Sequence, residues 1–559
     1  MPSTLLQYDP DCILSQANLP PGESLSAIFG VVDLFAGPGG LGEGFASFRT
    51  GDHAPFEIRV SIEKEASAHR TLQLRAFLRE HVARHGAYPQ SFIDFHAGRT
   101  GTPDWRSDDP AAWQLALDEA HALELGTPEA SAVVDDVIRK MPARFDDSVL
   151  IGGPPCQAYS VIGRVRARSD PDYVPENDPR HYLFREYLAV LDRLRPAAFV
   201  MENVRGMLSS TVKSRFVFEM LMEELASLGS GTRNIYQLYA IQVDGTTASL
   251  QRPKEARDFI VCAEDFGVPQ RRHRVIIIGI RSDLASGASV ARITLPCEKN
   301  TVKTAIGDLP PLRSGLSREH DDPDRWRDIV IGAAKSLSTL PRHESFQRAF
   351  ATVAEKLRSN APTQRKSTTL PPRYGRGDGD LLQWLERPQL QALAQHETRA
   401  HMDSDLGRYL FASVYGQVCK DSPKASDFPA ELEPRHLNWA SGAFSDRFRV
   451  QIAGEPSTTV TSHISKDGHY YIHHDPLQCR SLTVREAARL QTFPDDYLFL
   501  GNRTQQYVQV GNAVPPLLAR QIAKLVYLAL SGRSSKPGKA GADTTNQATA
   551  SQQLTMTYQ

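Results

Sequence analysis

One short stretch constrains the fold of this chain more than any other. An apolar run at residues 148–151 leads into two glycines, two prolines and Cys156. A short, uninterrupted apolar run of this kind is typical of a buried parallel strand. The glycines end the strand and let the backbone turn, and the prolines stiffen the residues after the turn. The pattern therefore predicts Cys156 on a rigid turn at the carboxyl end of a strand, where open α/β sheets bind their ligands.

The thiol of Cys156 has two interpretations. A cysteine in this position can act as a nucleophile if its surroundings lower its pKa or pair with its thiolate. It can equally be a small buried hydrophobic residue, which is the commonest fate of a free cysteine. The motif alone does not choose between these interpretations, so the rest of the chain has to decide.

A second unit of strand, turn and helix lies near the N-terminus. Residues 27–35 predict a strand, residues 36–40 form a glycine-rich turn, and a helix begins at about Leu41. This order is the ligand-binding opening of a doubly wound fold. The turn lacks the spacing of a dinucleotide fingerprint and the lysine of a phosphate loop. Its glycines would still let the backbone approach a ligand closely.

Further strands are predicted at residues 56–62, 198–201 and 275–280. The first ends in Glu63, a carboxylate that suits a ribose diol, although a solvated charge is the better interpretation of this residue on its own. The second leads into Glu202, whose carboxylate can reach the same cleft as Cys156. The third follows a run of arginines in which Arg272 and Arg274 alternate, so we expect both to point to one face.

The predicted fold class is α/β, with a doubly wound, Rossmann-like domain and a second, irregular domain. Within the second domain, residues 444–451 and 457–463 predict strands joined to a turn at 464–469. Thr483 and Glu486 have the spacing of a helix capping box, and an apolar helix runs from about 513 to 530. The predicted division is an N-terminal arm at 1–26, a first domain at 27–281 with an acidic helical insertion at about 96–146, a second domain at 282–479, a return to the first domain at 480–530 and a disordered tail at 531–559.

Composition limits the partners and the cellular compartment that we expect for this chain. The 559 residues include 64 Lys+Arg and 65 Asp+Glu, so a nucleic-acid surface would have to come from local clusters of arginine. Six scattered cysteines without a CxxC pair indicate neither a disulfide framework nor a metal site. We find no apolar run long enough to span a membrane and no signal peptide. A reducing, cytoplasmic setting fits these features and keeps Cys156 available as a thiol.

The segment after Cys156 is rich in glycine and arginine. It contains Arg164, Arg166 and Arg168 and predicts a mobile loop with positive charge for a polyanion. An ordinary solvated loop is an equally good interpretation, because such charge runs are common.

Six ordered blocks stand out along the chain: Asp33-Leu34-Phe35-Ala36-Gly37-Pro38-Gly39-Gly40, Gly153-Pro154-Pro155-Cys156-Gln157, Glu202-Asn203-Val204, Gln270-Arg271-Arg272-His273-Arg274, Arg485-Glu486-Ala487-Ala488-Arg489-Leu490-Gln491 and Gly511-Asn512-Ala513-Val514. Taken together, they resemble the motifs of the prokaryotic type of DNA (cytosine-5) methyltransferase. Each block is weak alone, but all six in the family's order are very specific. Two departures stand out. The acidic insertion is longer than in compact relatives, so the identity of the third acid that contacts the cofactor stays open, and Lys64 stands where many relatives place an aromatic residue.

The resemblance implies a catalytic mechanism. Cytosine C5 is a poor nucleophile, and a thiolate that adds to C6 makes C5 able to attack an electrophilic methyl group. Cys156 would supply that thiolate, and Glu202 would meet N3 of the base as an acid. Asn203 would hold the loop, Arg274 would reach O2 of the base and Arg272 would support the loop.

The resemblance also implies the ligands. The methyl donor would be S-adenosyl-L-methionine, and the target would be a cytosine flipped out of double-stranded DNA. The cofactor-binding positions implied are Asp33, Phe35, Ala36, Gly37, Gly39, Gly40, Leu41, Glu63, Pro155, Leu183, Asn512 and Val514. The DNA-binding positions are Gln157, Ser160, Arg164, Arg166, Gln270, Thr459, Thr461, His463 and Lys466, with His469 beside them.

The resemblance assigns the first domain, at 27–281, to catalysis and cofactor binding and the second, at 282–479, to target recognition. Within the second domain, residues 455–469 carry the proposed sequence readers, because two strands joined by a polar turn can enter a major groove. The alternative is that these are ordinary polar residues of a hairpin.

Two other functions compete with this interpretation. One is methylation of cytosine C5 in transfer RNA, which a subfamily of the same fold performs with a smaller recognition domain. The other is an idle DNA-binding scaffold, which would need none of Cys156, Glu202 and Arg274. The implied partners are double-stranded DNA, to which the chain binds as a monomer in the nucleoid, and a cognate restriction endonuclease or other defence proteins.

Overall fold

The computed structural model describes residues 27–154, 183–212, 215–228, 235–318, 320–372, 374–375, 379–434 and 446–531. The predicted arm at 1–26, the segment at 155–182 with Cys156, and residues 532–559 lie outside the described residues. The strand predicted at 444–451 lies partly outside them.

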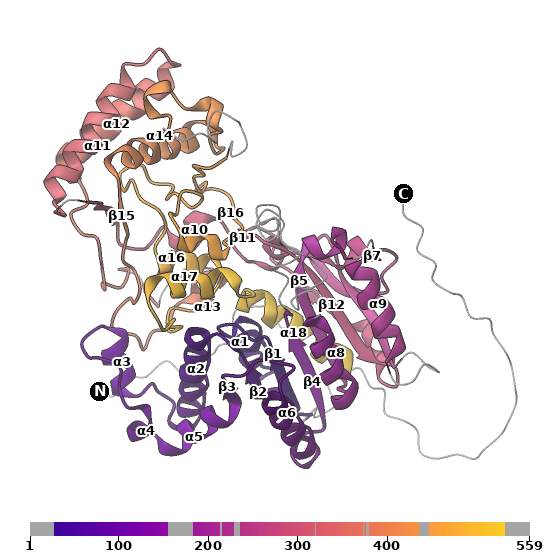
Figure 1. Ribbon diagram of the computed structural model, residues 1–559. Helices are drawn as coiled ribbons and strands as arrows, with labels where there is room; N and C mark the ends of the chain where they lie inside the picture. Colours follow the sequence, from indigo (N-terminus) through magenta and orange to yellow (C-terminus); the bar gives the residue numbers. More distant parts are fainter. Residues whose placement is uncertain are drawn as a thin grey trace, which may run out of the picture.

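Ten of the described strands form one mixed sheet (Figure 1). Five are parallel and run in the order β5-β4-β1-β2-β3, and β12 pairs antiparallel with β5. The remaining strands extend the sheet beyond β12 in antiparallel fashion. The strands are β1 (Phe29–Leu34), β2 (Phe56–Ile62), β3 (Ala120–His121), β4 (Asp147–Gly152), β5 (Ala198–Val204), β8 (Tyr236–Asp244), β9 (Thr247–Gln251), β10 (Ile260–Cys262), β12 (His273–Arg281) and β13 (Arg292–Thr294).

The central parallel strands β1 and β4 are mostly apolar because both of their faces are covered, as is usual for a parallel sheet. The neighbouring strand β2 alternates instead, with Glu57 and Arg59 half-buried. Every residue of β1 is buried. Its side chains alternate between two cores: Phe29 and Val31 pack with α1 (Gly40–Ser47) and α18 (Pro516–Ser531), whereas Val32 and Leu34 face α6 (Pro128–Lys140), α8 (Leu183–Leu194) and α9 (Val217–Ser227). The predicted doubly wound fold is confirmed.

One helical stretch among the described residues is apolar enough to cross a membrane by length and composition, which the sequence analysis did not predict. It spans Arg503–Ser531 and comprises α17 (Arg503–Asn512) and α18. Of its most apolar window, 78 % is buried inside the protein. Because α18 packs on α1 and the sheet, this stretch is a core helix.

Short helices fill the region between β2 and β4. They follow the long helix α2 (Ala66–His85), and β3 interrupts them to join the edge of the sheet. Three of them have side-chain caps at their N-termini: Asp104, Asp109 and Thr127 each accept backbone hydrogen bonds at a helix start. The helices are α3 (Gln90–His96), α4 (Trp105–Asp108), α5 (Pro110–Glu119) and α6.

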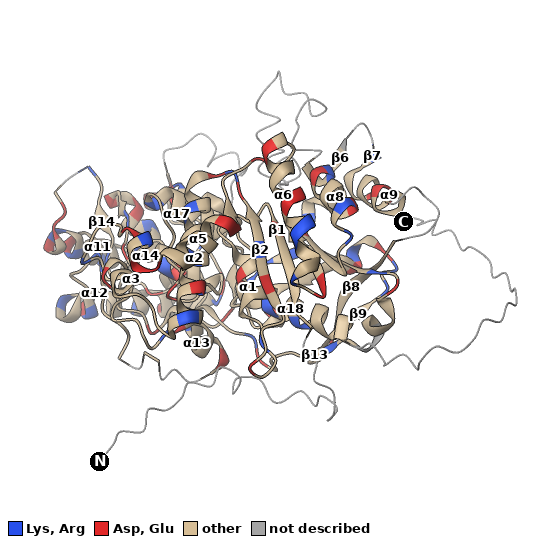
Figure 2. Cartoon of the chain, turned by 90° about the horizontal axis from the view of Figure 1, so that it is seen from below, with Lys and Arg blue, Asp and Glu red and all other residues tan. Residues whose placement is uncertain are grey.

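The second region, which comprises residues 282–479, is more helical than the irregular domain that the sequence predicted. Three helices, α11 (Pro323–Ser338), α12 (Glu344–Asn360) and α14 (Asp403–Cys419), pack around one core at the end of the molecule farthest from the sheet (Figure 1). Acidic and basic residues are interspersed along the ribbon of this bundle (Figure 2), in keeping with the net charge of -1 of the whole chain. Shorter elements complete the region: α10 (Val302–Ile306), α13 (Asp380–Leu385), β14 (Gly315–Leu316) and β15 (Ala400–His401).

The strand predicted at 457–463 is largely wrong. Only β16 (Ser457–Thr458) is a strand, and it pairs in parallel with β11 (Gln270–Arg271) before the short 3-10 helix η10 (Ser462–Ser465). The physical reason is that side chains, rather than a neighbouring strand, accept hydrogen bonds from the backbone N–H groups of this segment. The backbone N–H of Thr458 donates to Gln451, that of Val460 to Gln270 and that of Thr461 to Tyr471. With these amides satisfied, the segment needs no partner strand.

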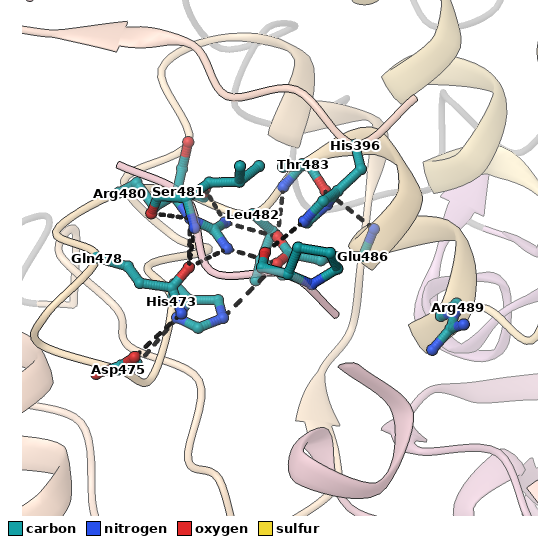
Figure 3. A network of polar contacts seen from close by, with 12 residues as sticks. His396, His473, Asp475, Gln478, Arg480, Ser481, Leu482, Thr483, Glu486 and Arg489 are labelled. Atoms are coloured by element: carbon teal, nitrogen blue, oxygen red, sulfur yellow. Dashed lines mark hydrogen bonds and ion pairs between the residues drawn. The ribbon is translucent and has the colours of Figure 1, made fainter. Parts of the chain in front are cut away.

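The return segment carries the predicted capping box. Thr483 and Glu486 cap α16 (Val484–Leu490) reciprocally, as the sequence predicted. Glu486 is also clamped by Arg480, whose two terminal nitrogens lie 2.6 and 2.7 Å from its carboxylate oxygens (Figure 3). Burial alone would raise the pKa of Glu486, but the adjacent guanidinium holds it well below its usual range. Both side chains are buried, so the pair fixes α16 against the second region.

The other described elements are short. The strands β6 (Thr211–Val212) and β7 (Arg215–Phe216) pair in antiparallel fashion. The 3-10 turns are η1 (Met141–Ala143), η4 (Arg205–Ser209), η5 (Ala256–Phe259), η6 (Ala263–Phe266), η7 (Ala285–Val290), η8 (Ala425–Asp427) and η9 (Ala430–Leu432).

Candidate active site

The order of the strands selects one edge of the sheet. From β1 the chain crosses to β2 on one side, and it later enters β4 on the other side. The carboxyl ends of β2, β1, β4 and β5 therefore meet at the point where the order of the strands reverses. Open α/β sheets bind ligands in the crevice outside such a switch point.

The glycine-rich turn after β1 needs its glycines for their backbone conformation. Gly37 and Gly39 have φ values of 58° and 96°, which are in the left-handed region. Gly39 also stands at the N-cap of α1. Phe35 shares the left-handed conformation, with φ of 55°, which is unusual for a bulky residue and is found mostly where function or packing demands it. The turn is thus held in a strained and specific shape.

Glu63, at the end of β2, fastens this turn. Its Oε2 accepts a hydrogen bond of 2.9 Å from the N–H of Gly37, and its Oε1 accepts one of 2.7 Å from the N–H of Glu65. Burial raises the pKa of Glu63, and the two amide hydrogen bonds oppose that rise. Each carboxylate oxygen keeps a further lone pair for a ligand hydroxyl. The residue is therefore both a brace for the turn and a potential acceptor in the crevice.

Asp33 lies beneath the turn. It is fully buried, and neither of its oxygens makes a hydrogen bond to any described residue. Burial raises its pKa well above the usual range, and the negative charges of Glu119 and Glu63 add to the effect. Oδ2 would lie 2.8 Å from a Cβ placed on Gly42, so the carboxyl group packs tightly against the first turn of α1.

A buried ion network supports the turn from below, and no sequence pattern predicted it. Arg75 of α2 donates to Glu43 of α1 at 2.8 Å and pairs with Asp496 of the return segment. Tyr497 donates to the carbonyl of Pro38 within the turn itself. The only signal in the sequence is Glu43, a charged residue within an otherwise apolar helix start. Its partner Arg75 lies 32 residues along the chain, and the other partner of Arg75, Asp496, lies 421 residues from that arginine, which no local pattern reveals.

Residues near the C-terminus of α17 complete this side of the crevice. A Cβ on Gly40 would lie 2.1 Å from the carbonyl oxygen of Val514, so only glycine permits this approach. Asn512 is the last residue of α17 and is exposed. Three other predicted cofactor positions belong to different elements. Leu183 begins α8, and Ala36 and Leu41 are buried beside the turn.

Glu202 and Arg274 form an ion pair at the ends of two adjacent strands. The Nε of Arg274 lies 3.0 Å from Oε1 of Glu202, and both side chains are nearly buried. Antiparallel pairing of β5 with β12 sets Arg274 opposite Val204 and so brings the two groups together. A Cβ on Gly153 would lie 3.0 Å from the other carboxylate oxygen. The pair therefore stands directly beside the end of the β4 segment that leads to Cys156.

Asn203 ties that same segment down. Its Nδ2 donates to the carbonyl of Pro154 at 3.2 Å, and its Oδ1 accepts from the N–H of Val204 at 2.9 Å. The side chain is buried. The structure thus brings Glu202, Asn203 and Arg274 together at the last described residues before the thiol. The other predicted residues of this segment, namely Pro155, Cys156, Gln157, Ser160, Arg164 and Arg166, lie outside the described residues.

Arg272 and Arg274 go to different partners. The strand is interrupted at Arg272, so simple alternation does not extend across it. Arg272 is buried, and its Nη1 donates to the carbonyls of Val460 at 2.9 Å and Gly511 at 3.3 Å. It links the catalytic sheet to the second region and to α17.

Gln270 is also wholly buried, with all of its described partners inside the protein. Its amide nitrogen donates to Leu490 and Gln491, and its oxygen accepts from Val460. In this conformation the side chain faces protein rather than the surface.

Some of the proposed sequence readers already make hydrogen bonds within the protein through their side chains, whereas others are exposed. The hydroxyl of Thr459 donates to the carbonyl of Arg271 at 2.6 Å, and that of Thr461 lies 2.8 Å from the hydroxyl of Tyr471. Lys466 is exposed and His463 is half-buried. Burial lowers the pKa of His463, and the charge of Lys466 adds to the effect. His469, by contrast, is buried and lies 2.8 Å from the hydroxyl of Tyr409.

Comparison with known proteins gives consistent results. A sequence model of the family described as C-5 cytosine-specific DNA methylase matches residues 130–527, which is more than half of the chain. The chain is 31 % identical over 525 residues to the type II methyltransferase M.Bpa9945I of Bacillus paralicheniformis, covering 90 % of this chain and 99 % of the relative. It is 27 % identical over 403 residues to the DNA (cytosine-5-)-methyltransferase M.ApeKI of Aeropyrum pernix, covering 68 % and 81 %.

Proposed function

The chain belongs to the C-5 cytosine-specific DNA methylase family and is a DNA (cytosine-5-)-methyltransferase, and we propose that it modifies one specific double-stranded DNA sequence as the methylating enzyme of a restriction–modification system. A cognate endonuclease would be its functional partner, and it would act as a monomer on DNA of the nucleoid. Relatives named as type II methyltransferases support this proposal.

The observation that carries the proposal is the grouping of Glu202, Asn203 and Arg274 around Gly153 and Pro154. It joins a carboxyl group and a guanidinium beside the segment that continues to a cysteine. A thiolate, an acid and a fixed cation are the groups that covalent activation of a cytosine ring requires.

The proposed chemistry assigns each residue one step. The Cys156 thiolate adds to C6 of the flipped cytosine, while Glu202 delivers a proton to N3 as charge builds there. Arg274 then holds O2 of the base, which requires its bond to Glu202 to loosen. After C5 has taken the methyl group, water removes the C5 proton, Glu202 takes the N3 proton back, the C5–C6 double bond re-forms and the thiolate leaves. Asn203 keeps the Cys156 segment in place throughout.

The crevice fits S-adenosyl-L-methionine, which the family uses and which supplies an electrophilic methyl group when bound. Glu63 offers carboxylate oxygens for the ribose hydroxyls. The glycine turn leaves open space, since a Cβ on Gly37 would meet no atom within 4 Å. Lys64 is turned toward Glu124, 2.9 Å away, so adenine stacking would have to come from another residue, for which Phe35 is our candidate.

We expect Glu63→Ala to weaken S-adenosyl-L-methionine binding and to leave DNA affinity unchanged, because the carboxylate serves only the cofactor side of the crevice. Isothermal titration calorimetry with the cofactor, and a separate DNA-binding assay, would measure both. Glu57→Ala is the matched control, since Glu57 lies near the opposite end of the same strand and pairs with Arg59 and Arg144. Unchanged cofactor affinity in Glu63→Ala would move the ribose contact to another acid.

Direct assays separate the proposed function from its alternatives. The purified chain would be incubated with labelled cofactor and either duplex DNA or transfer RNA. DNA containing 5-fluorocytosine would test for a covalent adduct, because fluorine at C5 prevents release of the enzyme. Methylated transfer RNA would favour the RNA enzyme, and binding without an adduct would favour the scaffold. Bisulfite sequencing of DNA from an expressing host would then reveal the target sequence.

For specificity, we expect Lys466→Ala and His463→Ala each to relax the sequence preference at one position of the site. A residue that reads a base edge loses about 1–3 kcal/mol of discrimination at that position, whereas a phosphate contact weakens all sequences alike. Profiling methylation across a random-sequence library would measure this, with the exposed Lys335 of α11 as control. If both variants keep the wild-type preference, recognition lies elsewhere, most plainly within residues 281–434.

A further inference from the structure

A cluster of metal-binding side chains lies outside the site described above. It joins the C-terminal end of α2 to the start of α5, two helices that pack against each other at the edge of the molecule (Figure 1). The members are His81 and His85 of α2 and Asp109, the N-cap of α5. Their candidate ligand atoms all lie within 4.8 Å of one another.

The spacing of the two histidines suits a metal ion. Residues four apart in a helix lie on the same face, and paired histidines at this spacing form half of a common zinc-binding arrangement. The imidazole rings of His81 and His85 are 4.4 Å apart between centroids. Nδ1 of His81 lies 3.4 Å and Nε2 of His85 lies 3.0 Å from Oδ2 of Asp109. One carboxylate oxygen thus faces both rings.

The carboxylate divides its two oxygens between two tasks. Oδ1 caps α5 by accepting from the backbone N–H groups of Ala111 and Ala112, and Arg84 approaches the same atom at 3.4 Å. Oδ2 takes no part in the cap and is directed at the histidines. The helix start therefore holds the carboxylate in a fixed orientation before any ion arrives.

One ring nitrogen of His81 lacks a hydrogen-bond partner among the described residues. His81 is 8 % exposed, and its buried Nδ1 has no hydrogen-bond partner among the described residues, although Oδ2 of Asp109 is close. A buried polar atom without a partner is costly and is rare in native structures. A metal ion between Nδ1 and Oδ2 would remove that cost.

We propose that His81, His85 and Asp109 bind one Zn²⁺ ion that fastens α2 to α5. Two imidazole nitrogens and one carboxylate oxygen are a donor set that zinc accepts, whereas calcium and magnesium prefer oxygen ligands alone. Distances of 3.0 and 3.4 Å between ligand atoms suit a tetrahedral site with metal–ligand bonds of about 2.0–2.2 Å. The fourth position would take water, because the side chain of His85 is 53 % exposed.

The competing explanation is a plain ion cluster, in which protonated histidines and Arg84 share the charge of Asp109. The two explanations differ in the role of Arg84. In an ion cluster its loss weakens the arrangement, whereas beside a bound cation its loss removes a repelling charge. Cysteine spacing indicates no metal site in this chain, but it carries no information on a cluster of histidines and an aspartate.

The test is Zn²⁺ binding by the full chain after treatment with EDTA. Calorimetry with ZnCl₂ and the visible absorption of bound Co²⁺ would be recorded for the wild type and for His85→Ala, Asp109→Asn and Arg84→Ala. His85 is largely exposed, so its loss removes little packing, and Asn caps helices as well as Asp does. Thermal unfolding with and without Zn²⁺ would show whether the ion stabilises the fold.

We expect the wild type to bind one equivalent of Zn²⁺ that His85→Ala and Asp109→Asn lose, with affinity reduced by about 100-fold or more, beyond the 10–100-fold cost of losing an outer-shell partner. Arg84→Ala should bind at least as tightly as the wild type. Zn²⁺ should raise the unfolding temperature of the wild type and Arg84→Ala only. The proposal is overturned if the wild type binds no zinc, or if His85→Ala and Asp109→Asn bind the same number of ions with the same affinity.

Discussion

Replacing Cys156 by alanine is expected to abolish methyl transfer and to leave DNA binding intact. The thiolate enters only the covalent step, so its loss removes activation of C5 without removing a contact to the DNA backbone. Loss of a nucleophile from a covalent catalyst lowers the rate by on the order of 10⁴-fold or more. Cys156→Ser should behave similarly, because a hydroxyl is a far weaker nucleophile than a thiolate.

Single-turnover methylation of duplex DNA with labelled cofactor would measure this effect, and a gel-shift assay would check DNA binding. Trapping on 5-fluorocytosine DNA adds a second readout, since Cys156→Ala should form no adduct. Cys262→Ala is a suitable control, because Cys262 is a half-buried cysteine on β10. Methylation by Cys156→Ala at close to the wild-type rate would show that the proposed covalent mechanism is wrong.

The centre of the sheet could be predicted from sequence because β1 and β4 are buried on both faces and are therefore mostly apolar. The strand predicted at 56–62 coincides with β2, and the capping box at Thr483 is present as predicted. Both features depend on residues within a few positions of one another. The glycine turn was visible for the same reason, since the backbone conformations of Gly37 and Gly39 are local requirements.

The second region was predicted poorly because its structure depends on distant side chains. An alternating run at 457–463 normally indicates a strand, yet Gln270 and Gln451 satisfy amide groups that a neighbouring strand would otherwise bind. No local pattern reveals such partners. In place of the predicted hairpin, the segment forms a short strand pairing followed by a 3-10 turn.

Buried arginines explain the remaining differences between the predicted site and the observed one. Arginine is seldom fully buried, and the alternation of Arg272 and Arg274 predicted that both point to one face. Arg272 instead has 1 % exposure and donates to the carbonyls of Val460 and Gly511. Arg480 and Arg489 are likewise buried in pairs with Glu486 and Asp495. Only the fold shows that Arg272 binds the carbonyls of Val460 and Gly511, whereas Arg274 pairs with Glu202.

Glu202→Gln should lower the rate of methyl transfer by about 10²-fold or more, the usual scale for losing a general acid. The substitution keeps the size of the side chain and leaves a carbonyl oxygen that can accept from Arg274 in place of Oε1, 3.0 Å away in the wild type. It removes the ability to give a proton to N3 of the base. Because the amide can still donate a hydrogen bond to N3, base binding should be largely preserved and the loss should fall on the chemical step.

Rapid-quench measurement of a single turnover would separate that step from binding, and DNA affinity would be measured alongside. Glu264→Gln is the matched control, because Glu264 is another buried glutamate nearby that pairs with His273 and lies outside the proposed chemistry. Arg274→Ala should also slow the chemical step. If Glu202 and Arg274 act on the same base, the double variant should lose less than the product of the two single losses, because the two residues are in contact. A Glu202→Gln enzyme with an unchanged single-turnover rate would mean that another group protonates N3.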